Sequence, residues 1–588
     1  MPSLRFLPLT VLLLGPAATQ AHAQAELPVI HISDYLSGLE ETRTALDAVY
    51  TQPASKHGGT QAAYEIGDTR TFKVYNHDES SRTTSMVLDD LNFTLLAEGE
   101  HFLVWVETSE LNNGHVRETD VISLSNALQD ETPEGSIDAS SGILDNNERI
   151  FGAPPDVDGD DRTDILLVDI RDGWVSGSTR GYVAGFVWSG DLSRTGNHRD
   201  VVYADVNPGL FREGNHLSTA GIEATVAHEY QHLIHFNYDL KELTFVNEGL
   251  AEWASVMNGY STRNISYLAD AKEHNVSLLD WREDAASLSD YQRAGLFTTY
   301  LAQRLGVEAT GRIVRARSGS ANLIGVDGYH LVAADAGLEF PDLVSDFHVA
   351  NYLNDRILGD EFGYELQSRS LVRAMPTFSY EGAGNDVMAD FPFNAGSVQY
   401  FVWSEITNLS LTIDVSSTIP ASMVSSMRDR MRITTVAERF DGDADIRRWD
   451  VDGIPMVFEG EYDRISVILV HHSAEAKGVR LDFSAVWGTS SSVAAETSEL
   501  PLSVTLDQNY PNPFNPQTHI RYQLYEAAHV RLRVFDALGR QAAVLVDRHL
   551  PAGNHEAVLD AADWPGGTYL YVLESGSRSL YKAMTLAR

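Results

Sequence analysis

Two histidines and a glutamate in the middle of the chain have the spacing of a metal-activated hydrolytic site. His228 and His232 stand four positions apart in His-Glu-Tyr-Gln-His, so on a helix both imidazoles project from one face and can bind one metal ion. Glu229 lies beside them and could reach a water on that metal. The chain holds 20 histidines, so a chance match on an ordinary helix is the alternative interpretation.

The elements around this pattern favour a built site over a chance match. Apolar residues recur at helical spacing through residues 218–236, which predicts an amphipathic helix that carries both histidines. These apolar residues are Ile222, Val226, Leu233 and Phe236. A second predicted helix, residues 246–257, follows after a short connection and contains two glutamates.

That second helix is the best source of a third metal ligand. The sequence does not continue with a glycine and a third histidine, since His235 and Tyr238 occupy those positions, so the metzincin pattern fails. Glu248 and Glu252 stand one helical turn apart and face the same way, so either carboxylate could approach the metal. Two histidines and a glutamate leave the fourth position of a catalytic zinc open for water.

Four segments together resemble the gluzincin group of zinc peptidases, and above all the secreted hyicolysin-like neutral metallopeptidases. They are His228–His232, Asn247–Gly249, the Asp-rich turn 156–160 and the stretch 181–186. The likeness covers roughly residues 67–306. It implies an α+β zincin catalytic domain with Zn2+ in its active site.

The resemblance also implies roles for individual residues. His228, His232 and Glu248 would bind the zinc, and Glu252 would orient a metal histidine from behind. The interval from His232 to Glu248 is shorter than in thermolysin-like enzymes and would suit Glu252 better. Motif identity favours Glu248 as the third ligand, and Glu252 stays the alternative.

A site of this type hydrolyses peptide bonds in a protein or peptide substrate. Zinc polarises the carbonyl and acidifies its bound water, while Glu229 takes the water's proton and returns it to the leaving amine. The tetrahedral oxyanion needs a donor. Residues 290–296 resemble the helix start that carries this donor in related aminopeptidases, so Tyr291 is the candidate. A packing or capping tyrosine is the alternative for Tyr291.

Three functional hypotheses follow from these residues. The first is a secreted zinc metalloendopeptidase, the second is a surface-associated binding protein on a degenerate zincin scaffold, and the third is a zinc aminopeptidase. The intact Glu229 and the complete set of ligands favour an enzyme over a binding protein. An aminopeptidase needs a further acid to hold the substrate amine, and the sequence does not single one out.

An acidic turn before the histidine helix has carboxylates at calcium-loop spacing. Its acidic residues are Asp156, Asp158, Asp160 and Asp164, with Gly159 in the turn. The full EF-hand pattern fails, because Leu167 stands where the closing glutamate belongs. A structural Ca2+ site is one interpretation, and a solvated acidic turn is the other.

The pattern of strands and helices predicts several domains around the site. Strand-like alternation dominates the N-terminal part, helical periodicity the middle, and short strands with turn signals the C-terminal part. The predicted fold is multidomain, with the α+β zincin catalytic domain flanked by a β-rich N-terminal domain and C-terminal β-sandwich domains. The predicted segments are a signal peptide at 1–25, the β-rich domain at 26–149, the catalytic domain at 150–375, a β-sandwich at 376–488, a linker at 489–500 and a second β-sandwich at 501–588.

Composition excludes several classes of partner. The formal net charge is −40, which disfavours nucleic acid and anionic lipid surfaces because both need a basic surface. The chain has no cysteine, so its metal sites must use histidines and carboxylates. Residues 1–25 combine Arg5, a short apolar run and small residues before a cleavage site, as signal peptides do, and we expect no stable membrane span.

The C-terminal segment resembles the sorting domains of type IX secretion. The likeness is carried by Gln508–Pro516, Asp536–Arg540 and Gly566–Tyr569, and it covers nearly all of residues 501–588. It implies export in two steps, with the signal peptide used at the inner membrane and this domain recognised by the type IX secretion machinery. The expected location is therefore secreted or at the cell surface.

Overall fold

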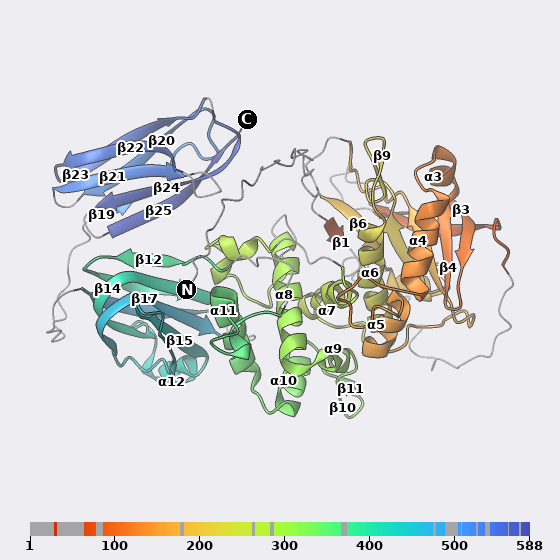
Figure 1. The fold of residues 1–588 in the computed structure, drawn as a ribbon, viewed down its shortest axis with the longest axis horizontal. Helices are drawn as coiled ribbons and strands as arrows, with labels where there is room; N and C mark the ends of the chain where they lie inside the picture. The colour runs from red at the N-terminus through yellow and green to blue at the C-terminus, as the bar shows by residue number, and fades with distance from the viewer. Residues whose placement is uncertain are drawn as a thin grey trace, which may run out of the picture.

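The structure is a computed structural model of the chain (Figure 1). The residues that it describes are 29–31, 64–77, 86–176, 181–260, 265–282, 287–365, 373–473, 478–488, 504–506, 509–524, 527–535, 541–562, 564–575 and 578–587. The predicted signal peptide, 1–25, and the predicted linker, 489–500, lie outside them. Multiple domains with α+β architecture and β-rich sheets make up the described chain, as the sequence predicts.

The N-terminal half is built on a seven-stranded mixed sheet. Its strands are β1 (Val29–His31), β2 (Thr69–His77), β3 (Met86–Glu98), β4 (Phe102–Glu107), β5 (Thr163–Val168), β6 (Tyr182–Phe186) and β7 (Val201–Asp205). They lie in the order β1-β6-β7-β5-β4-β3-β2. The central strands β4, β5 and β7 are parallel and wholly buried, as their continuous apolar sequences require.

Helices cover one face of this sheet (Figure 1). A separate core that includes Phe72, Trp105 and Tyr203 forms from other side chains of the sheet. The helices are α3 (Thr108–Asn113), α4 (Glu118–Gln129), α5 (Ile143–Phe151) and α6 (Ala220–Tyr238), and a hairpin of β8 (Phe211–Arg212) and β9 (Asn215–His216) precedes α6. The prediction that residues 26–149 are β-rich is wrong for 108–149. Val121, Leu124 and Leu128 are buried at a spacing of three to four residues, which is the periodicity of a helix and not of a strand.

The sheet also crosses the predicted boundary at 149/150. Strands β2 to β4 precede this boundary and β5 to β7 follow it, yet all belong to one sheet. The side chains of β4 and β5 share a core with those of α6. We therefore propose that the predicted N-terminal and catalytic domains form a single folding unit.

A helical block follows the sheet. It contains α7 (Thr244–Met257), α8 (Ser287–Leu305), α9 (Val307–Val314), α10 (Val326–Asp335) and α11 (Phe340–Leu353), with a small hairpin of β10 (Arg317–Ser318) and β11 (Ala321–Asn322). The predicted helices at 218–236 and 246–257 are confirmed as α6 and α7. Gly306 adopts φ 89° between α8 and α9, where the chain turns sharply.

The next region is a second seven-stranded sheet. Its strands are β12 (Phe378–Glu381), β13 (Gly384–Phe393), β14 (Val398–Val415), β15 (Met431–Glu438), β16 (Ala444–Trp449), β17 (Met456–His471) and β18 (Val479–Trp487), and α12 (Ala421–Arg428) follows β14. A sandwich of two sheets is predicted here, but the strands form one continuous ladder. The long strand β14 joins them. Along one edge it pairs with β17, and along its other edge it pairs first with β12 and then with β18.

The C-terminal region has two sheets around one core. The first contains β19 (Val504–Leu506), β20 (Gln517–Leu524) and β23 (Gly553–Asp560), and the second contains β21 (Ala528–Phe535), β22 (Gln541–Leu550), β24 (Gly567–Ser575) and β25 (Arg578–Leu586). Inward residues alternate with outward ones along β20 and β21, which is the pattern of strands with one buried face. Ile520, Leu532 and Leu573 meet in the shared core.

The helical block packs directly on the second sheet (Figure 1). Tyr400 of β14 donates a hydrogen bond to the carbonyl oxygen of His348 at 3.1 Å, and Arg448 contacts Asp346 of α11 at 2.6 Å. We call this contact between α11 and the second sheet the seam. Within the described part of the chain, no helix combines the length and apolarity needed to cross a bilayer.

Candidate metal centre

The structure brings His228, His232 and Glu248 together. His228 and His232 lie one turn apart on α6, and Glu248 lies on the neighbouring α7. His228 Nε2 is 3.2 Å from Glu248 Oε2, His232 Nε2 is 3.4 Å from the same oxygen, and the two Nε2 atoms are 3.2 Å apart. All three side chains are almost completely buried. Two nitrogens and one oxygen thus form a nearly equilateral triangle.

This triangle has the dimensions of three ligands around a tetrahedral zinc. Zinc takes histidine nitrogen and carboxylate oxygen at about 2.0–2.1 Å, so two tetrahedral ligand atoms lie about 3.3 Å apart. The three sides of 3.2 to 3.4 Å fit that value. The donor set of two imidazoles and one carboxylate also suits zinc. The side chains therefore fit the metal that the sequence predicts.

The outer nitrogens of both histidines face polar groups. Glu252 Oε1 lies 3.5 Å from His228 Nδ1, the ring nitrogen that points away from the triangle. Asn247 Oδ1 lies 3.1 Å from His232 Nδ1 and 2.9 Å from His235 Nδ1. Such contacts fix ring orientation and place the proton on Nδ1, which leaves Nε2 free to bind a metal. Asn247 belongs to the motif Asn247–Gly249, but no feature of the sequence predicts its contact with the two histidines.

The charge state of the centre follows from its burial and its imidazoles. Burial alone would raise the pKa of Glu248, but His232 and hydrogen bonds from both imidazoles outweigh it and hold that pKa well below its ordinary range. Burial, with a further contribution from His232, lowers the pKa of His235 to about 3. The carboxylate is therefore ionised and His235 is neutral at ordinary pH.

Buried amides fix the helices that carry these residues. Asn147 of α5 donates from Nδ2 to the carbonyl oxygen of Ala227 at 2.9 Å. Asn258, at the end of α7, donates to Asn147 Oδ1 at 2.7 Å and to the carbonyl oxygen of Ala254 at 2.8 Å. Three helices are thus tied together beside His228. Neither asparagine has a sequence signal that distinguishes it from a surface amide.

Glu229 is completely buried and faces β6. A Cβ built on Gly185 of β6 would lie 3.3 Å from Glu229 Cγ and 2.5 Å from Thr225 Cγ2. Glycine at this position lets α6 approach the sheet so closely that Glu229 lies against the strand. Strand β6 therefore passes directly beside the side chain of Glu229.

Tyr291 lies in the first turns of α8 and is buried against Trp281, with ring centroids 4.7 Å apart. It stands one helical turn before Gly295, where a Cβ would lie 2.8 Å from Glu252 Cβ. Tyr291 is therefore on the face of α8 that packs toward α7. Its role as oxyanion donor stays a prediction.

The four predicted calcium residues do not form one site. Arg199 lies among three of them, contacting Asp158 at 2.6 Å, Asp160 at 2.9 Å and also Asp164. Asp164 is fully buried and accepts a further hydrogen bond from Trp105 Nε1 at 2.7 Å. The guanidinium of Arg199 thus offsets part of the negative charge of this cluster. Arg199 lies 35 positions after Asp164, and nothing in the sequence pointed to it.

A different acidic group forms at the same turn. Carboxylate oxygens of Asp156, Asp158 and Asp200 lie within 4.8 Å of one another. Asp200 is buried, and burial together with the charge of Asp158 raises its pKa well above the ordinary value. Calcium binding at this turn stays a prediction.

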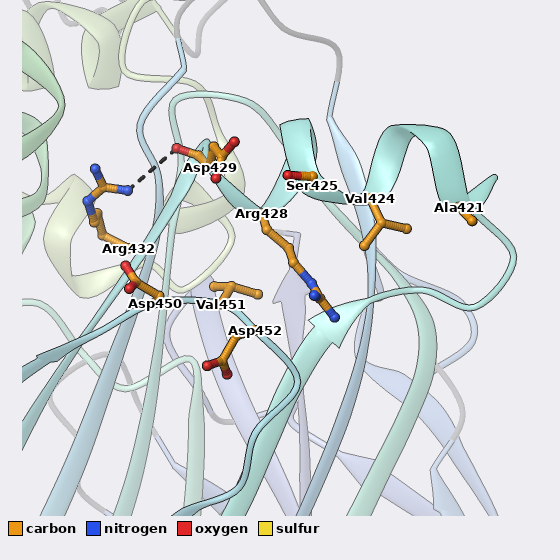
Figure 2. A pocket seen from close by; sticks show the side chains of 9 residues that line it. All are labelled: Ala421, Val424, Ser425, Arg428, Asp429, Arg432, Asp450, Val451 and Asp452. Atoms are coloured by element: carbon orange, nitrogen blue, oxygen red, sulfur yellow. Dashed lines mark hydrogen bonds between the residues drawn. The ribbon is translucent and has the colours of Figure 1, made fainter.

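A hollow of about 700 Å³ lies far along the chain from these residues, beside α12 (Figure 2). Arg428, Asp429, Arg432 and Asp452 line it, and Arg428 also forms an ion pair with Asp414 at 2.6 Å. The hollow contains none of the predicted site residues.

Comparison with known proteins adds two findings. Residues 508–586 match the family described as secretion system C-terminal sorting domain. The chain is also 30% identical over 167 residues to the neutral metalloprotease ShpI of Staphylococcus hyicus, an alignment that covers 26% of this chain and 37% of the relative. The chain is thus a distant homologue of a metalloprotease over part of its length, and its type IX sorting domain makes it a secreted or cell-surface protein.

The chain also has weak similarity to solved structures. Aminopeptidase A of Legionella pneumophila aligns with 67% of this chain and 36% of its own at 11% identity, with a TM-score of 0.29. The mitogen of Yersinia pseudotuberculosis aligns with 20% of this chain and 99% of its own at 8% identity, with a TM-score of 0.14. Scores this low support no argument about fold or function.

Proposed function

We propose that this protein is a secreted zinc metalloendopeptidase of the gluzincin type. The observation that supports this most strongly is the triangle of His228 Nε2, His232 Nε2 and Glu248 Oε2, whose sides fit a tetrahedral zinc. The distant homology to a neutral metalloprotease points the same way. In this proposal the first sheet and helices α3 to α11 form the zincin catalytic unit.

The proposed chemistry is hydrolysis of an internal peptide bond in an extended substrate. Zinc bound at the three atoms would act as a Lewis acid toward water and the scissile carbonyl. Glu229 would accept the proton of the attacking water and deliver it to the leaving amine. Its complete burial beside β6 would keep bulk water from competing for that proton. Tyr291 would donate a hydrogen bond to the developing oxyanion.

Two polar side chains would hold the histidine rings in the orientation that binds the metal. Asn247 and Glu252 would accept the Nδ1 protons of His232 and His228, which fixes the tautomer that offers Nε2 to the metal. The type IX secretion machinery would recognise residues 508–586 and export the enzyme to proteins or peptides outside the cell.

The test is the variant Glu229→Gln. We expect casein hydrolysis to fall by about 10²–10⁴-fold, because the general base is lost while the ligands remain. Bound zinc, measured by metal analysis of the purified protein, should stay at the native level. Glu223→Gln is the matched control and should retain activity, since Glu223 lies on the same helix and accepts a hydrogen bond from the Ser123 hydroxyl at 3.1 Å. Near-native turnover of Glu229→Gln would contradict the proposed mechanism.

The products of the native enzyme separate the remaining hypotheses. Fragments cut inside the casein chain, identified by mass spectrometry, are expected from an endopeptidase. Stepwise loss of N-terminal residues would indicate an aminopeptidase instead. A zinc-loaded protein that cleaves nothing would support a binding protein on a degenerate scaffold.

A further inference from the structure

His235 is a buried histidine of α6 that the proposed reaction does not use. It stands three positions after His232 and is not one of the three residues that form the triangle. It occupies the position at which the metzincin pattern has a glycine. Its side chain is almost completely buried. Burial of an imidazole is costly unless its polar atoms are bonded, so the bond that His235 makes indicates its role.

His235 shares its hydrogen-bond acceptor with the metal-centre residue His232. Asn247 Oδ1, on α7, lies 2.9 Å from His235 Nδ1 and 3.1 Å from His232 Nδ1. An amide oxygen only accepts hydrogen bonds and has two lone pairs, so it can take one N–H from each ring. Both imidazoles then carry their proton on Nδ1. His232 is left with a bare Nε2 toward the triangle, as metal binding requires.

The second donor limits the freedom of the amide. With His232 as its one donor, the Asn247 side chain and the imidazole could turn together about their common hydrogen bond. His235 holds the same oxygen from a second point on α6, one helical turn along. All three side chains are buried, where an amide that turned away would leave an N–H unpaired at a large cost. The shared acceptor therefore fixes the plane of the His232 ring.

The same contact bears on the third corner of the triangle. Asn247 directly precedes Glu248 on α7. A bond that holds Asn247 against α6 therefore also holds the turn from which Glu248 reaches the Nε2 atoms of both histidines. His235 thus acts on two sides of the triangle, through Asn247 alone.

We propose that His235 is a positioning residue of the metal centre, which acts through Asn247 on the ring of His232 and on the turn that carries Glu248. The proposal rests on the proposed function in taking zinc as the metal. Loss of a residue that orients a metal ligand typically weakens metal binding by about 10–100-fold. Since His235 acts through a second residue, the expected effect lies at the low end of that range.

The test compares His235→Leu with His235→Asn in the full chain. The two side chains have nearly the same shape, but the asparagine amide places an N–H close to the position of the histidine Nδ1 and leucine has no donor. Zinc dissociation constants are measured on metal-free protein by competition with a chelator dye. We expect His235→Leu to bind zinc about tenfold more weakly and His235→Asn to bind it nearly as tightly as the native chain.

Thermal melts separate positioning from packing. Both substitutions leave a similar space, so Tm should fall by a similar amount in both variants while zinc affinity differs between them. His348→Leu makes the same change at another buried histidine, on α11, and should leave zinc affinity unchanged. Equal losses of affinity in His235→Leu and His235→Asn, or native affinity in both, would overturn the positioning role.

A double-mutant cycle tests whether the effect passes through Asn247. In a chain with Asn247→Ala the shared acceptor is gone, so adding His235→Leu or His235→Asn should change zinc affinity equally. A difference between these two double variants as large as in the native background would show that His235 acts by another route, and would contradict the proposal.

Kinetics separate this proposal from the peptidase assignment. With zinc at saturation, His235→Leu should lower kcat for a fluorogenic peptide and leave KM unchanged, and His235→Asn should restore kcat. Hydrolysis that depends on Glu229, in chains whose zinc affinity does not depend on a donor at position 235, would keep the peptidase and reject the positioning role. Zinc affinity that depends on this donor, in chains that hydrolyse nothing, would keep the positioning role and reject the peptidase.

Discussion

At the scale of the residue, the two glutamates of α7 have different positions relative to His228. Glu248 reaches the Nε2 atoms of both histidines, whereas Glu252 faces the opposite nitrogen of His228. This geometry supports Glu248 as the metal ligand and Glu252 as the group that orients His228. The alternative assignment would need Glu252 to turn around the imidazole ring.

The assignment predicts unequal effects on zinc affinity. Glu248→Gln removes the charged ligand and should weaken zinc binding by more than about 100-fold, whereas Glu252→Gln should weaken it by about 10–100-fold. Zinc dissociation constants from competition with a chelator dye measure both. If Glu252→Gln loses the metal while Glu248→Gln keeps it, the two roles are reversed.

At the scale of the element, the site depends on the close crossing of α7 and α8. A Cβ on Gly249 would lie 2.6 Å from Thr298 Oγ1 and 3.1 Å from the carbonyl oxygen of Ala294, both on α8. Gly249 directly follows Glu248, so any retreat of α7 would move Glu248 away from the histidines. Gly249 has ordinary helical backbone angles, so its conformation does not require glycine. Glycine is needed because a larger side chain would push α7 and α8 apart.

We predict that Gly249→Ala lowers both Tm and zinc affinity. Overpacking of a buried helix contact costs about 1–3 kcal/mol, and the displaced Glu248 adds the loss of metal binding. Gly221→Ala on α6 is the matched control, because a Cβ there meets nothing within 4 Å and alanine favours a helix. Thermal melts with and without zinc measure both effects. A Gly249→Ala protein as stable and as tightly metal-bound as the native one would contradict the role of this crossing.

At the scale of the whole molecule, two neutral histidines lie buried where the helical block meets the second sheet. His348 lies on α11 at the seam, and His274 lies in the turn before α8. Burial lowers the pKa of His274 to about 4 and the pKa of His348 to about 3. His274 stacks edge-on against Tyr400 of the second sheet, with ring centroids 5.0 Å apart. A hydrogen bond with the carbonyl oxygen of Leu268 and the charges of Asp270 and Glu273 raise the pKa of His274 in part. His274 and Arg293 further lower the pKa of His348.

These histidines predict that the seam weakens in acid. Their folded pKa values lie below the ordinary 6.5, so the folded state keeps them neutral while the unfolded state takes up protons. Stability is therefore full above pH 6.5 and falls as the pH drops toward 4, by about 1–2 kcal/mol for each histidine at pH 5.

Urea unfolding at pH 7.5 and pH 5 measures this loss. His348→Leu should make the stability less dependent on pH, because it removes one titrating group. His330→Gln, at an exposed position, should leave the dependence unchanged. Equal pH dependence in the native protein and His348→Leu would show that His348 does not contribute.

The C-terminal region has its own core, which predicts that it can be removed without harm to the rest. Deletion of residues 501–588 should leave Tm and peptidase activity of the remaining chain unchanged, because the core around Ile520 and Leu532 is separate from the others. The truncated protein should stay inside the cell, since the sorting domain is lost. Immunoblots of cells and medium measure this, and its appearance in the medium would assign the domain another role.

The sequence by itself determined the features that depend on local spacing. The periodicity of residues 218–236 and 246–257 predicted α6 and α7, because the apolar face of each helix repeats within a few residues. The His-Glu-Tyr-Gln-His spacing named His228 and His232, and the C-terminal motifs named the sorting domain. Each of these signals is contained in one short stretch of chain.

Only the tertiary structure decided what distant segments do together. The choice between Glu248 and Glu252 depends on the angle at which α7 crosses α6, which no interval along the chain determines. Arg199, in the loop just before β7, forms ion pairs with Asp158, Asp160 and Asp164, three of the four residues of the predicted calcium turn. The sheet joins strands on both sides of residue 149, because backbone pairing is set by packing between elements and leaves no pattern in either one alone.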